Sequence, residues 1–292
     1  MATRILILFL FINNIAFSQS FDWWSQTVNW DGVSHWSRYM ITQPGYQGPN
    51  SLPVPRIGNG SIDSVFSISA TANAHFSNGD NTQNVMLYGN YCIAKGKVAI
   101  DIQWVPYERY SMSHAIKTKR HVFSHNYYDK TATGEAHVST TIQLLNKWRD
   151  RWQLALRLGY RFPCGSGYAT ARYTDGPGYY FDLSFGKPLS RQFKWIGMLG
   201  FYSWQLVSDD HRQDDALLFG SGLEWNRPGW KAQGYVAGYL GYLKNSGDKP
   251  VVVRLNLEKK LQHSSLLFGF QQGLHDFAYS SFEAGFKFIL EK

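Results

Sequence analysis

The sequence predicts an all-β fold, a transmembrane antiparallel up-and-down β-barrel of about twelve strands. Three observations support this fold class. Apolar and polar residues alternate along most of the chain, aromatic residues make up 16% of the 292 residues, and charged residues only 17%. A soluble domain averages about 25% charged residues, whereas a strand between lipid and a lumen alternates apolar with polar positions. After the N-terminus, no apolar run reaches the roughly 20 residues that a membrane-spanning helix needs.

The N-terminus has the pattern of a secretory signal peptide. Residues 1–18 combine the basic Arg4 with a short apolar stretch and with small residues, Ala16 and Ser18, at the expected cleavage site. The apolar stretch is too short for a membrane anchor. We therefore expect an exported protein whose mature chain begins near Gln19.

Residues 19–61 differ in character from the rest of the chain. They contain four Trp and four of the ten Pro, and their alternation is weak. We expect an N-terminal extension that lies either in the periplasm or in the lumen, where it would plug the barrel. The barrel itself is expected over residues 62–292.

Turn-forming residues divide the barrel region into segments of about 10–15 residues. The expected strands are 62–77, 83–94, 97–110, 136–146, 151–162, 178–187, 192–206, 216–226, 229–243, 250–260, 263–272 and 280–290. The connections between them alternate between long, such as 111–135, and short, such as 94–97. Long outer loops and tight periplasmic turns produce this alternation in outer-membrane barrels. An even number of strands predicts that both termini lie in the periplasm.

The alternation also predicts which residues face the lumen. In the strand 152–162, the apolar side chains share one face with Trp152 and Phe162 at its two ends, and Arg157 and Arg161 lie on the other. Aromatic residues at the ends of the apolar face are typical of the two membrane interfaces.

The two cysteines are expected to remain free thiols. Cys92 falls near the periplasmic end of its strand, and Cys164 follows a strand at the outer end. A hydrocarbon core of about 25–30 Å would separate them, whereas a disulfide requires Cα atoms within roughly 7 Å.

The last strand resembles the C-terminal targeting strand of Gram-negative outer-membrane barrels. Its sequence, residues 279–292, alternates apolar with polar residues and includes Phe286 and Phe288, although Leu290 and two charged residues replace the usual terminal aromatic. Together with the signal peptide and Gln19 after the cut, it resembles exported proteins of bacteroidetes. The resemblance implies a porin-like protein of the outer membrane and names no activity.

Eight charged residues are expected on the lumen face. They are Arg157, Arg161, Arg254, Lys287, Asp101, Asp182, Glu224 and Glu258. Rings of Arg and Lys favour anions, and twelve-stranded porins for acidic oligosaccharides resemble this design. Alternatively, the charges pair with one another across a closed lumen, because acidic and basic residues are comparably numerous. The leading prediction is therefore a narrow, anion-preferring pore or a component of an envelope assembly, without enzymatic activity.

A local motif gives the alternative function, a lipid-acyl hydrolase. Residues 75–79, His-Phe-Ser-Asn-Gly, resemble the His-x-Ser-Asn-Gly stretch of outer-membrane phospholipases and the His-x-Ser-Asn of lipid A deacylases. The resemblance implies Ser77 as nucleophile and His75 as base, with Asn84 or Asn90 orienting the base. Against it, alternation turns His75 and Ser77 toward the lumen, away from lipid, and Ser-Asn-Gly-Asp is also a natural turn composition.

The remaining expectations concern partners. The formal charge of +8 is expected to be divided between the lumen and the outer loops, where residues 117–121 would meet lipopolysaccharide phosphates beside the outer-membrane lipids. Small anionic solutes or another envelope protein are further expected partners. Nucleic acid is not expected, because no stacking motif or basic cluster supports it and the signal peptide argues against access. His and Cys spacings match no metal motif, so no metal site and no cofactor are expected.

Overall fold

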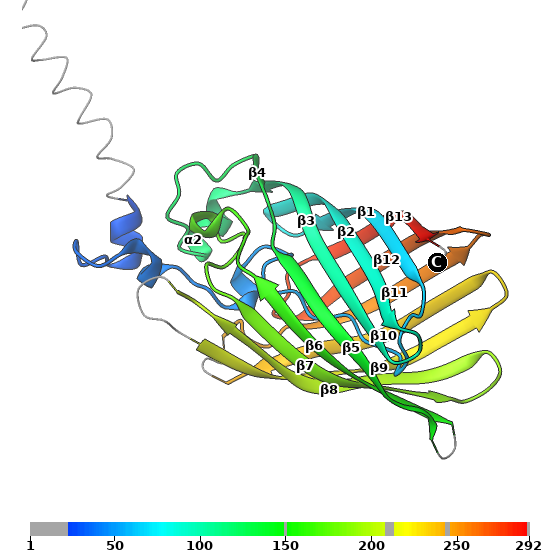
Figure 1. Cartoon of the computed structure of the whole chain (residues 1–292). Helices are drawn as coiled ribbons and strands as arrows, with labels where there is room; N and C mark the ends of the chain where they lie inside the picture. Colours follow the sequence, from blue (N-terminus) through cyan, green and yellow to red (C-terminus); the bar gives the residue numbers. More distant parts are fainter. Residues whose placement is uncertain (1–22, 149–150, 208–212, 243–245, 291–292) are drawn as a thin grey trace, which may run out of the picture.

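The computed structural model describes residues 23–148, 151–207, 213–242 and 246–290. Twelve antiparallel strands of these residues close into a barrel (Figure 1). The signal peptide expected at 1–18 lies outside the described residues. None of the helices in the described part of the chain is long and apolar enough to cross a bilayer.

The predicted fold class and the twelve barrel strands are confirmed. The strands are β1 (Phe66–Phe76), β2 (Asp80–Ala94), β3 (Val98–Met112), β5 (Ala136–Trp148), β6 (Trp152–Phe162), β7 (Gly178–Pro188), β8 (Phe193–Gln205), β9 (Gln213–Arg227), β10 (Trp230–Gly241), β11 (Val251–Lys260), β12 (Ser264–His275) and β13 (Ser280–Leu290). Each pairs with the next along the barrel, and β1 pairs with β13 from Phe66↔Leu290 to Phe76↔Ser280, which closes it.

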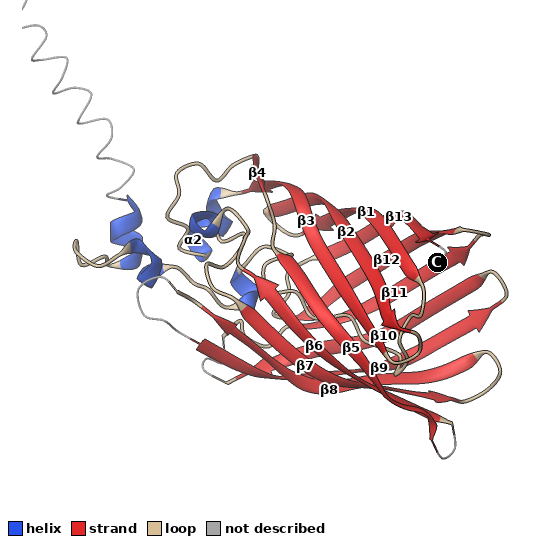
Figure 2. Ribbon diagram, viewed as in Figure 1, coloured by secondary structure: helices blue, strands red, loops and turns tan. Residues whose placement is uncertain are grey.

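The two ends of the barrel differ in their connections (Figure 2). At one end, here called the short-turn end, the strands are joined by tight turns such as 95–97 and 261–263. The opposite end, the loop end, contains the long connections 113–135 and 163–177. Two connections at the loop end are shorter than predicted. Strand β2 begins already at Asp80, so the expected loop 77–83 is reduced to a tight turn, and β12 continues to His275, so the expected connection 273–279 is reduced to 276–279.

Short elements cover the loop end. They are η1 (Trp36–Tyr39), η2 (Pro44–Tyr46), α2 (His114–Lys119), β4 (Lys130–Ala132), which pairs with β3, and η3 (Tyr168–Thr170), together with a helix in residues 23–28. The helix α2 begins where the Ser113 hydroxyl accepts a hydrogen bond from the Ile116 amide. Met40, Met112, Val122 and Tyr173 are among the residues that form a buried apolar core here. Alternation did not predict these elements because none is a barrel strand.

The outer wall of the barrel is apolar, as alternation predicted. Leu158 and Phe286 are 48% and 55% exposed, whereas the inward-facing Ala155 and Arg161 of β6 are fully buried. The same side-chain period of two places Ser67, Ser69, Thr71, Asn73 and His75 of β1 on the inside.

The lumen is not uniformly polar, which corrects the prediction. On the wall formed by β8 to β11, large inward-facing side chains such as Met198, Leu218, Tyr202 and Tyr239 are buried in one apolar core. Strand β8 is therefore apolar on both of its faces. The other half of the lumen wall, from β12 through β1 to β5, has the polar side chains that were expected.

The two ends of the described chain lie at opposite ends of the barrel (Figure 1). Residues 23–40 pack at the loop end, where the Trp24 indole nitrogen donates a hydrogen bond to the His121 carbonyl over 3.1 Å. Strand β13 ends at Leu290, beside Phe66 at the short-turn end. The prediction that both termini share one side is therefore wrong for the described residues. The even strand count places the barrel's first and last strand ends together, but the segment before β1 returns through the lumen.

Both cysteines are free thiols, as predicted. Cys92 is half-buried in β2, and Cys164 is exposed at the loop end.

The path of the N-terminal segment through the lumen predicts from which side of the membrane three single-cysteine variants can be labelled, in a background with Cys92 and Cys164 replaced by Ser. Val33, which is 90% exposed, and Tyr128, which is 68% exposed, both lie at the loop end. Lys95 lies in a tight turn at the other end. A membrane-impermeant maleimide is expected to label Val33→Cys and Tyr128→Cys from the same side of the membrane, and Lys95→Cys from the other. Labelling of Val33→Cys together with Lys95→Cys would contradict this path.

Candidate functional site

Residues 43–63, here called the lumen strap, run through the barrel from the loop end to the start of β1. Three apolar side chains of the strap, Leu52, Val54 and Ile57, are buried against the apolar wall of β8 to β11. Their burial fixes the strap on one side of the lumen, because fully burying each such side chain is worth about 1.5–3 kcal/mol. The strap, which includes the later part of the expected extension 19–61, therefore lies in the lumen, whereas residues 23–40 lie at the loop end.

Wall side chains also bind the strap backbone. The Tyr239 hydroxyl donates to the Leu52 carbonyl, and Nη2 of Arg254 donates to the Val54 carbonyl, each over 2.8 Å. Nη2 of Arg157 donates to the carbonyl of Arg56, also over 2.8 Å. An irregular segment inside a barrel has no ladder partner, so these donors satisfy carbonyls that would otherwise be buried unpaired.

Ion pairs and a close backbone contact hold the part of the strap nearest the short-turn end. Arg56 pairs with Glu283 at 2.5 Å, and Asp63 pairs with Lys287 at 3.1 Å. Gly60 has a φ of 77°, and a Cβ at this position would lie 2.5 Å from the amide nitrogen of Gly186. Glycine is required here because both the positive φ and the lack of space exclude a side chain.

The charges predicted for the lumen face are mostly paired. Arg157 binds Asp182 at 2.8 Å, and Glu224 accepts hydrogen bonds from Asn59 and Gln233 and pairs with Lys231 at 3.3 Å. Asp101 accepts hydrogen bonds from Tyr88 and Asn90, and Arg254 donates hydrogen bonds to Gln271 and to the strap. Lys287 pairs with Asp63. Glu258 lines the cavity described below. The alternative of paired structural charges therefore describes most of this set.

Arg161, the eighth predicted residue, belongs to the loop end. Its guanidinium donates to Glu135, Thr174 and the carbonyl of Gly176, with 2.6 Å to Glu135. Both side chains of this ion pair are fully buried. Arg161 therefore anchors the loop 163–177 and does not face an open lumen.

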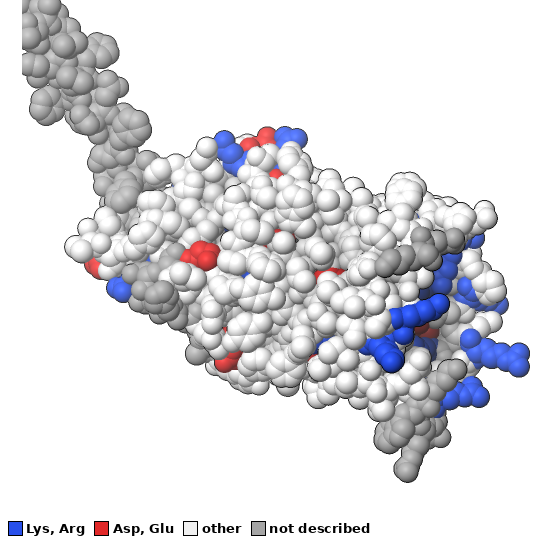
Figure 3. Space-filling model, viewed as in Figure 1, with Lys and Arg blue, Asp and Glu red and all other residues white. Residues whose placement is uncertain are grey.

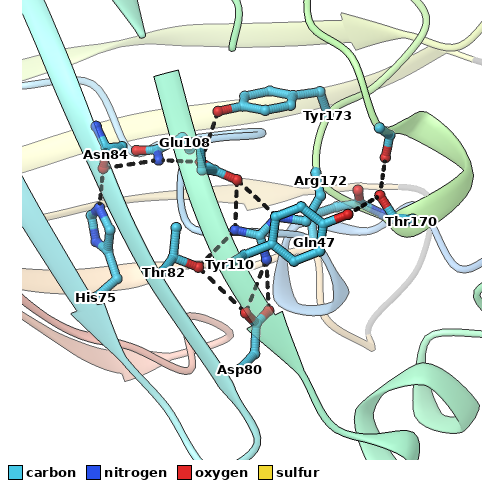
Figure 4. A network of polar contacts seen from close by, with 12 residues as sticks. Gln47, His75, Asp80, Thr82, Asn84, Glu108, Tyr110, Thr170, Arg172 and Tyr173 are labelled. Atoms are coloured by element: carbon cyan, nitrogen blue, oxygen red, sulfur yellow. Dashed lines mark hydrogen bonds and ion pairs between the residues drawn. The ribbon is translucent and has the colours of Figure 1, made fainter. Parts of the chain in front are cut away.

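A buried ionic network seals the loop end of the lumen (Figure 4). Arg172 donates to both oxygens of Asp80, at 3.0 and 2.8 Å, and to Glu108 at 2.9 Å. Arg120 and the Tyr279 hydroxyl also bind Asp80, each at 2.6 Å. Two guanidinium groups thus face two carboxylates, which makes the network electrically balanced.

The charged groups of the network are withdrawn from solvent. Asp80, Glu108 and Arg172 are fully buried. Burial alone would lower the pKa of Arg172, but the carboxylates of Asp80 and Glu108 raise that pKa well above its ordinary value. The guanidinium therefore stays charged, and its removal from the carboxylates would leave buried charges unpaired.

The lumen strap is joined to this network. Nδ2 of Asn50 donates to Glu108 over 2.7 Å, and the amide of Gly48 donates to the carbonyl of Ala171 over 2.9 Å. A Cβ at Gly48 would lie 2.8 Å from Cζ of Arg172. The lumen strap and the ionic network at the loop end are therefore connected through hydrogen bonds.

Sequence reasoning missed this network. Its residues come from two strand ends, two loops and the residue before β13, and no motif joins them. The available signal was that Asp80 and Glu108 are carboxylates on strands of a charge-poor chain, where an unpaired buried charge is not tolerated.

The predicted set Ser77, His75 and Asn90 is not assembled. The Ser77 hydroxyl donates to the Asp80 carbonyl over 2.9 Å, and Asn90 binds Asp101. His75 faces inward as predicted, but its ring nitrogens contact the Ser281 hydroxyl at 2.7 Å and the side-chain oxygen of the other predicted partner, Asn84, at 2.8 Å. Ser77 lies in the turn after β1, which ends at Phe76, so alternation no longer places it beside His75.

Two residues of the basic stretch 117–121 are buried among the elements that cover the loop end, whereas Lys119 is exposed. Lys117 is 4% exposed, and its Nζ lies 4.8 Å from the ring centre of Trp23 and 4.6 Å from that of Tyr127. Burial lowers the pKa of Lys117. Arg120 is 3% exposed and is bound to Asp80.

A cavity of about 770 Å³ remains beside the strap. Hydroxyl and amide side chains of β1 line one side of it, and strap residues 53–59 line the other. At the short-turn end it reaches Lys260 and Leu261, and toward the loop end it reaches His75 and Asn50, just short of the ionic network.

No family model matches the chain, and no curated protein matches its sequence. Among solved structures, an outer membrane channel from Pseudomonas putida F1 is similar with a TM-score of 0.56 and 9% identity, over 81% of this chain and 100% of that one. The KdgM porin gives a TM-score of 0.49 and 7% identity, over 76% of this chain and 99% of that one. At these identities the likeness concerns the fold, which is that of outer-membrane β-barrels.

The ionic network predicts a large loss of stability for Asp80→Asn. This variant keeps the side-chain shape but removes a carboxylate from two buried guanidinium groups, so we expect a loss of about 3–5 kcal/mol in the free energy of unfolding. Urea titration of the folded protein, followed by Trp fluorescence, measures this loss. The matched control is Asp129→Asn, whose partner Arg109 is exposed and which should change stability little. Equal stabilities of the two variants would exclude a structural role of the network.

Proposed function

We propose that this chain is an outer-membrane channel for small polar solutes that its own lumen strap holds closed. The apolar outer wall and the fold shared with an outer membrane channel support the membrane location. The observation that carries the proposal is the division of the lumen. The strap fills the apolar half of the lumen. Beside it remains a polar cavity that reaches the short-turn end and stops short of the ionic network at the loop end.

A solute that crosses the barrel has to pass two barriers. One is the strap itself, and the other is the network around Asp80 and Arg172. Because Asn50 and Gly48 tie the strap to this network, movement of the strap would loosen both barriers together. The closed form is expected to dominate at rest, since opening exposes apolar strap residues and separates matched charges.

The chemistry of the freed lumen favours polar solutes in general. Displacement of the strap would release Arg254 and Lys287 from their strap partners, but also Glu283 and Glu224. Cations and carboxylates would therefore become available together, beside the hydroxyl groups of β1. The anion preference inferred from Arg and Lys alone stays a prediction.

The two other predicted roles lead to different observations. The hydrolase required Ser77 beside His75, and the Ser77 hydroxyl is instead bound to the Asp80 backbone, so the geometry favours the channel. The envelope-assembly role needs no conductance and predicts that none of the variants described next conducts.

The strap predicts low conductance of the wild type in planar bilayers and high conductance of Leu52→Asp/Val54→Asp. The double variant places two carboxylates against the apolar core of β8 to β11, which should expel the strap, while the strand ladder that closes the barrel is unchanged. The control is Val33→Asp, at an exposed position. Heat-modifiable migration in detergent checks that each variant folds. A folded double variant that conducts no more than the wild type would refute the closed-channel proposal.

A reversible crosslink gives the opposite test. A Cβ at Gly58 would lie 2.8 Å from Cβ of Ser184, and disulfides join Cβ atoms about 3.5–4.5 Å apart, so a small shift allows Gly58→Cys/Ser184→Cys to lock the strap to β7. With Cys92 and Cys164 replaced by Ser, we expect oxidation to abolish any spontaneous openings and reduction to restore them. Openings that persist in the fully crosslinked protein would show that the strap is not a barrier.

A further inference from the structure

The positive charge of the protein is concentrated at the short-turn end. Figure 3 shows Lys and Arg clustered at this end of the visible face. The basic residues in or beside its turns are Lys95, Lys97, Arg151, Lys187, Arg191, Lys194, Arg227, Lys231, Lys259 and Lys260. The described carboxylates near them include Asp63, Glu224, Glu258 and Asp101, and the first two are paired with Lys287 and Lys231. This distribution corrects the expected division of the charge between lumen and outer loops.

Three of these cations lie over tryptophan rings. Nζ of Lys187 is 5.1 Å from the ring centre of Trp152, and Nζ of Lys259 is 4.3 Å from that of Trp230. Cζ of Arg227 is 5.8 Å from the ring centre of Trp225. These distances are within the range of cation–π contacts.

The paired side chains face outward from the barrel. Arg227 is three positions from Glu224, and Lys187 is five positions from Asp182, and both carboxylates point inward. An odd separation along a strand reverses the face. Tryptophan on the outer wall near a barrel end marks the level of the lipid headgroups, so the cations paired with it lie at that level too.

Trp230 has a cation on either side. Its register partner on β9 is Arg227, and its partner on β11 is Lys259. Paired positions on adjacent strands bring side chains close enough to act on one group. A phosphate above this indole could therefore contact a guanidinium from one strand and an ammonium from the other.

The loop end lacks a comparable arrangement among the described residues. Its outward-facing aromatic residues include Phe76, Phe162 and Tyr179, and no described cation lies over any of them. The loop-end cations Lys117, Lys119 and Arg172 instead contact the rings of Trp23, Tyr127, Tyr46 and Tyr110, none of which is an outward-facing tryptophan of the barrel wall. The pairing of outward tryptophan with a cation is thus a property of the short-turn end.

We propose that the outward face of the short-turn end binds the phosphates of anionic phospholipids through Lys187, Arg227 and Lys259, with the site around Trp230 as its centre. This inference rests on the proposed membrane location. Phospholipid is the occupant that fits, because these cations lie at headgroup level on the lipid-facing wall, and each basic residue near an anionic surface adds about 1 kcal/mol of attraction.

The test compares lipid retention by the purified full chain. Native mass spectrometry in a mixture of phosphatidylglycerol and phosphatidylcholine is expected to show preferential retention of phosphatidylglycerol. In Lys187→Gln/Arg227→Gln/Lys259→Gln, this preference should fall by up to about fivefold for each cation removed. The matched control, Arg109→Gln/Lys119→Gln/Lys130→Gln, removes the same charge at the loop end and should keep the preference.

The outcomes separate this inference from the proposed function. Equal retention of both lipids by the wild type, or equal losses in the two triple variants, overturns the lipid site while leaving the conductance results untouched. Failure of the wild type to migrate as a heat-modifiable barrel and to insert into vesicles would instead overturn the membrane location itself. Folding of each triple variant is checked by the same migration.

Discussion

The structure depends on the need to fill a twelve-strand lumen. The side chains of an eight-strand barrel just fill its interior, and the diameter grows with strand number, so twelve strands leave space that the wall cannot occupy alone. Here the lumen strap occupies part of it. Leu52, Val54 and Ile57 complete an apolar core with β8 to β11, and the remaining volume is the polar cavity of about 770 Å³ beside β1. The barrel thus resembles a globular protein on one side of its interior and a channel on the other.

The charges inside the barrel are arranged around this strap. Arg157 and Arg254 satisfy strap carbonyls, and Glu283 and Lys287 pair with strap side chains of opposite sign. At the loop end, Asp80 and Glu108 balance Arg120 and Arg172 in a buried environment where an unpaired charge would be strongly unfavourable. The excess cations lie at the short-turn end, in and beside turns that are open to solvent. The uneven distribution of charge follows from which parts of the barrel exclude water.

Features that depend on neighbouring residues in the sequence were predictable, whereas features that depend on contacts between distant segments were not. The faces of β6 were predictable because Arg157 and Arg161 alternate with apolar residues, and alternation depends only on the period of a strand. The apolar inner face of β8 was not, because Ile196 and Met198 point toward a strap far away in the sequence. The motif at His75 suggested Ser77 as its partner, yet the actual partner, Ser281, is 206 positions away and is brought there by the pairing of β1 with β13.

The sequence by itself determined the twelve-strand barrel, its apolar outer wall and the separation of Cys92 from Cys164, because backbone hydrogen bonding and the two-residue period are local and repeat along the chain. Only the tertiary structure decided that residues 43–63 cross the lumen, that residues 23–40 lie at the loop end, and that Asp80 meets Arg172. These contacts join segments whose separation in the sequence carries no periodic signal. They form because a closed barrel leaves an interior that must be filled and buried charges that must be matched.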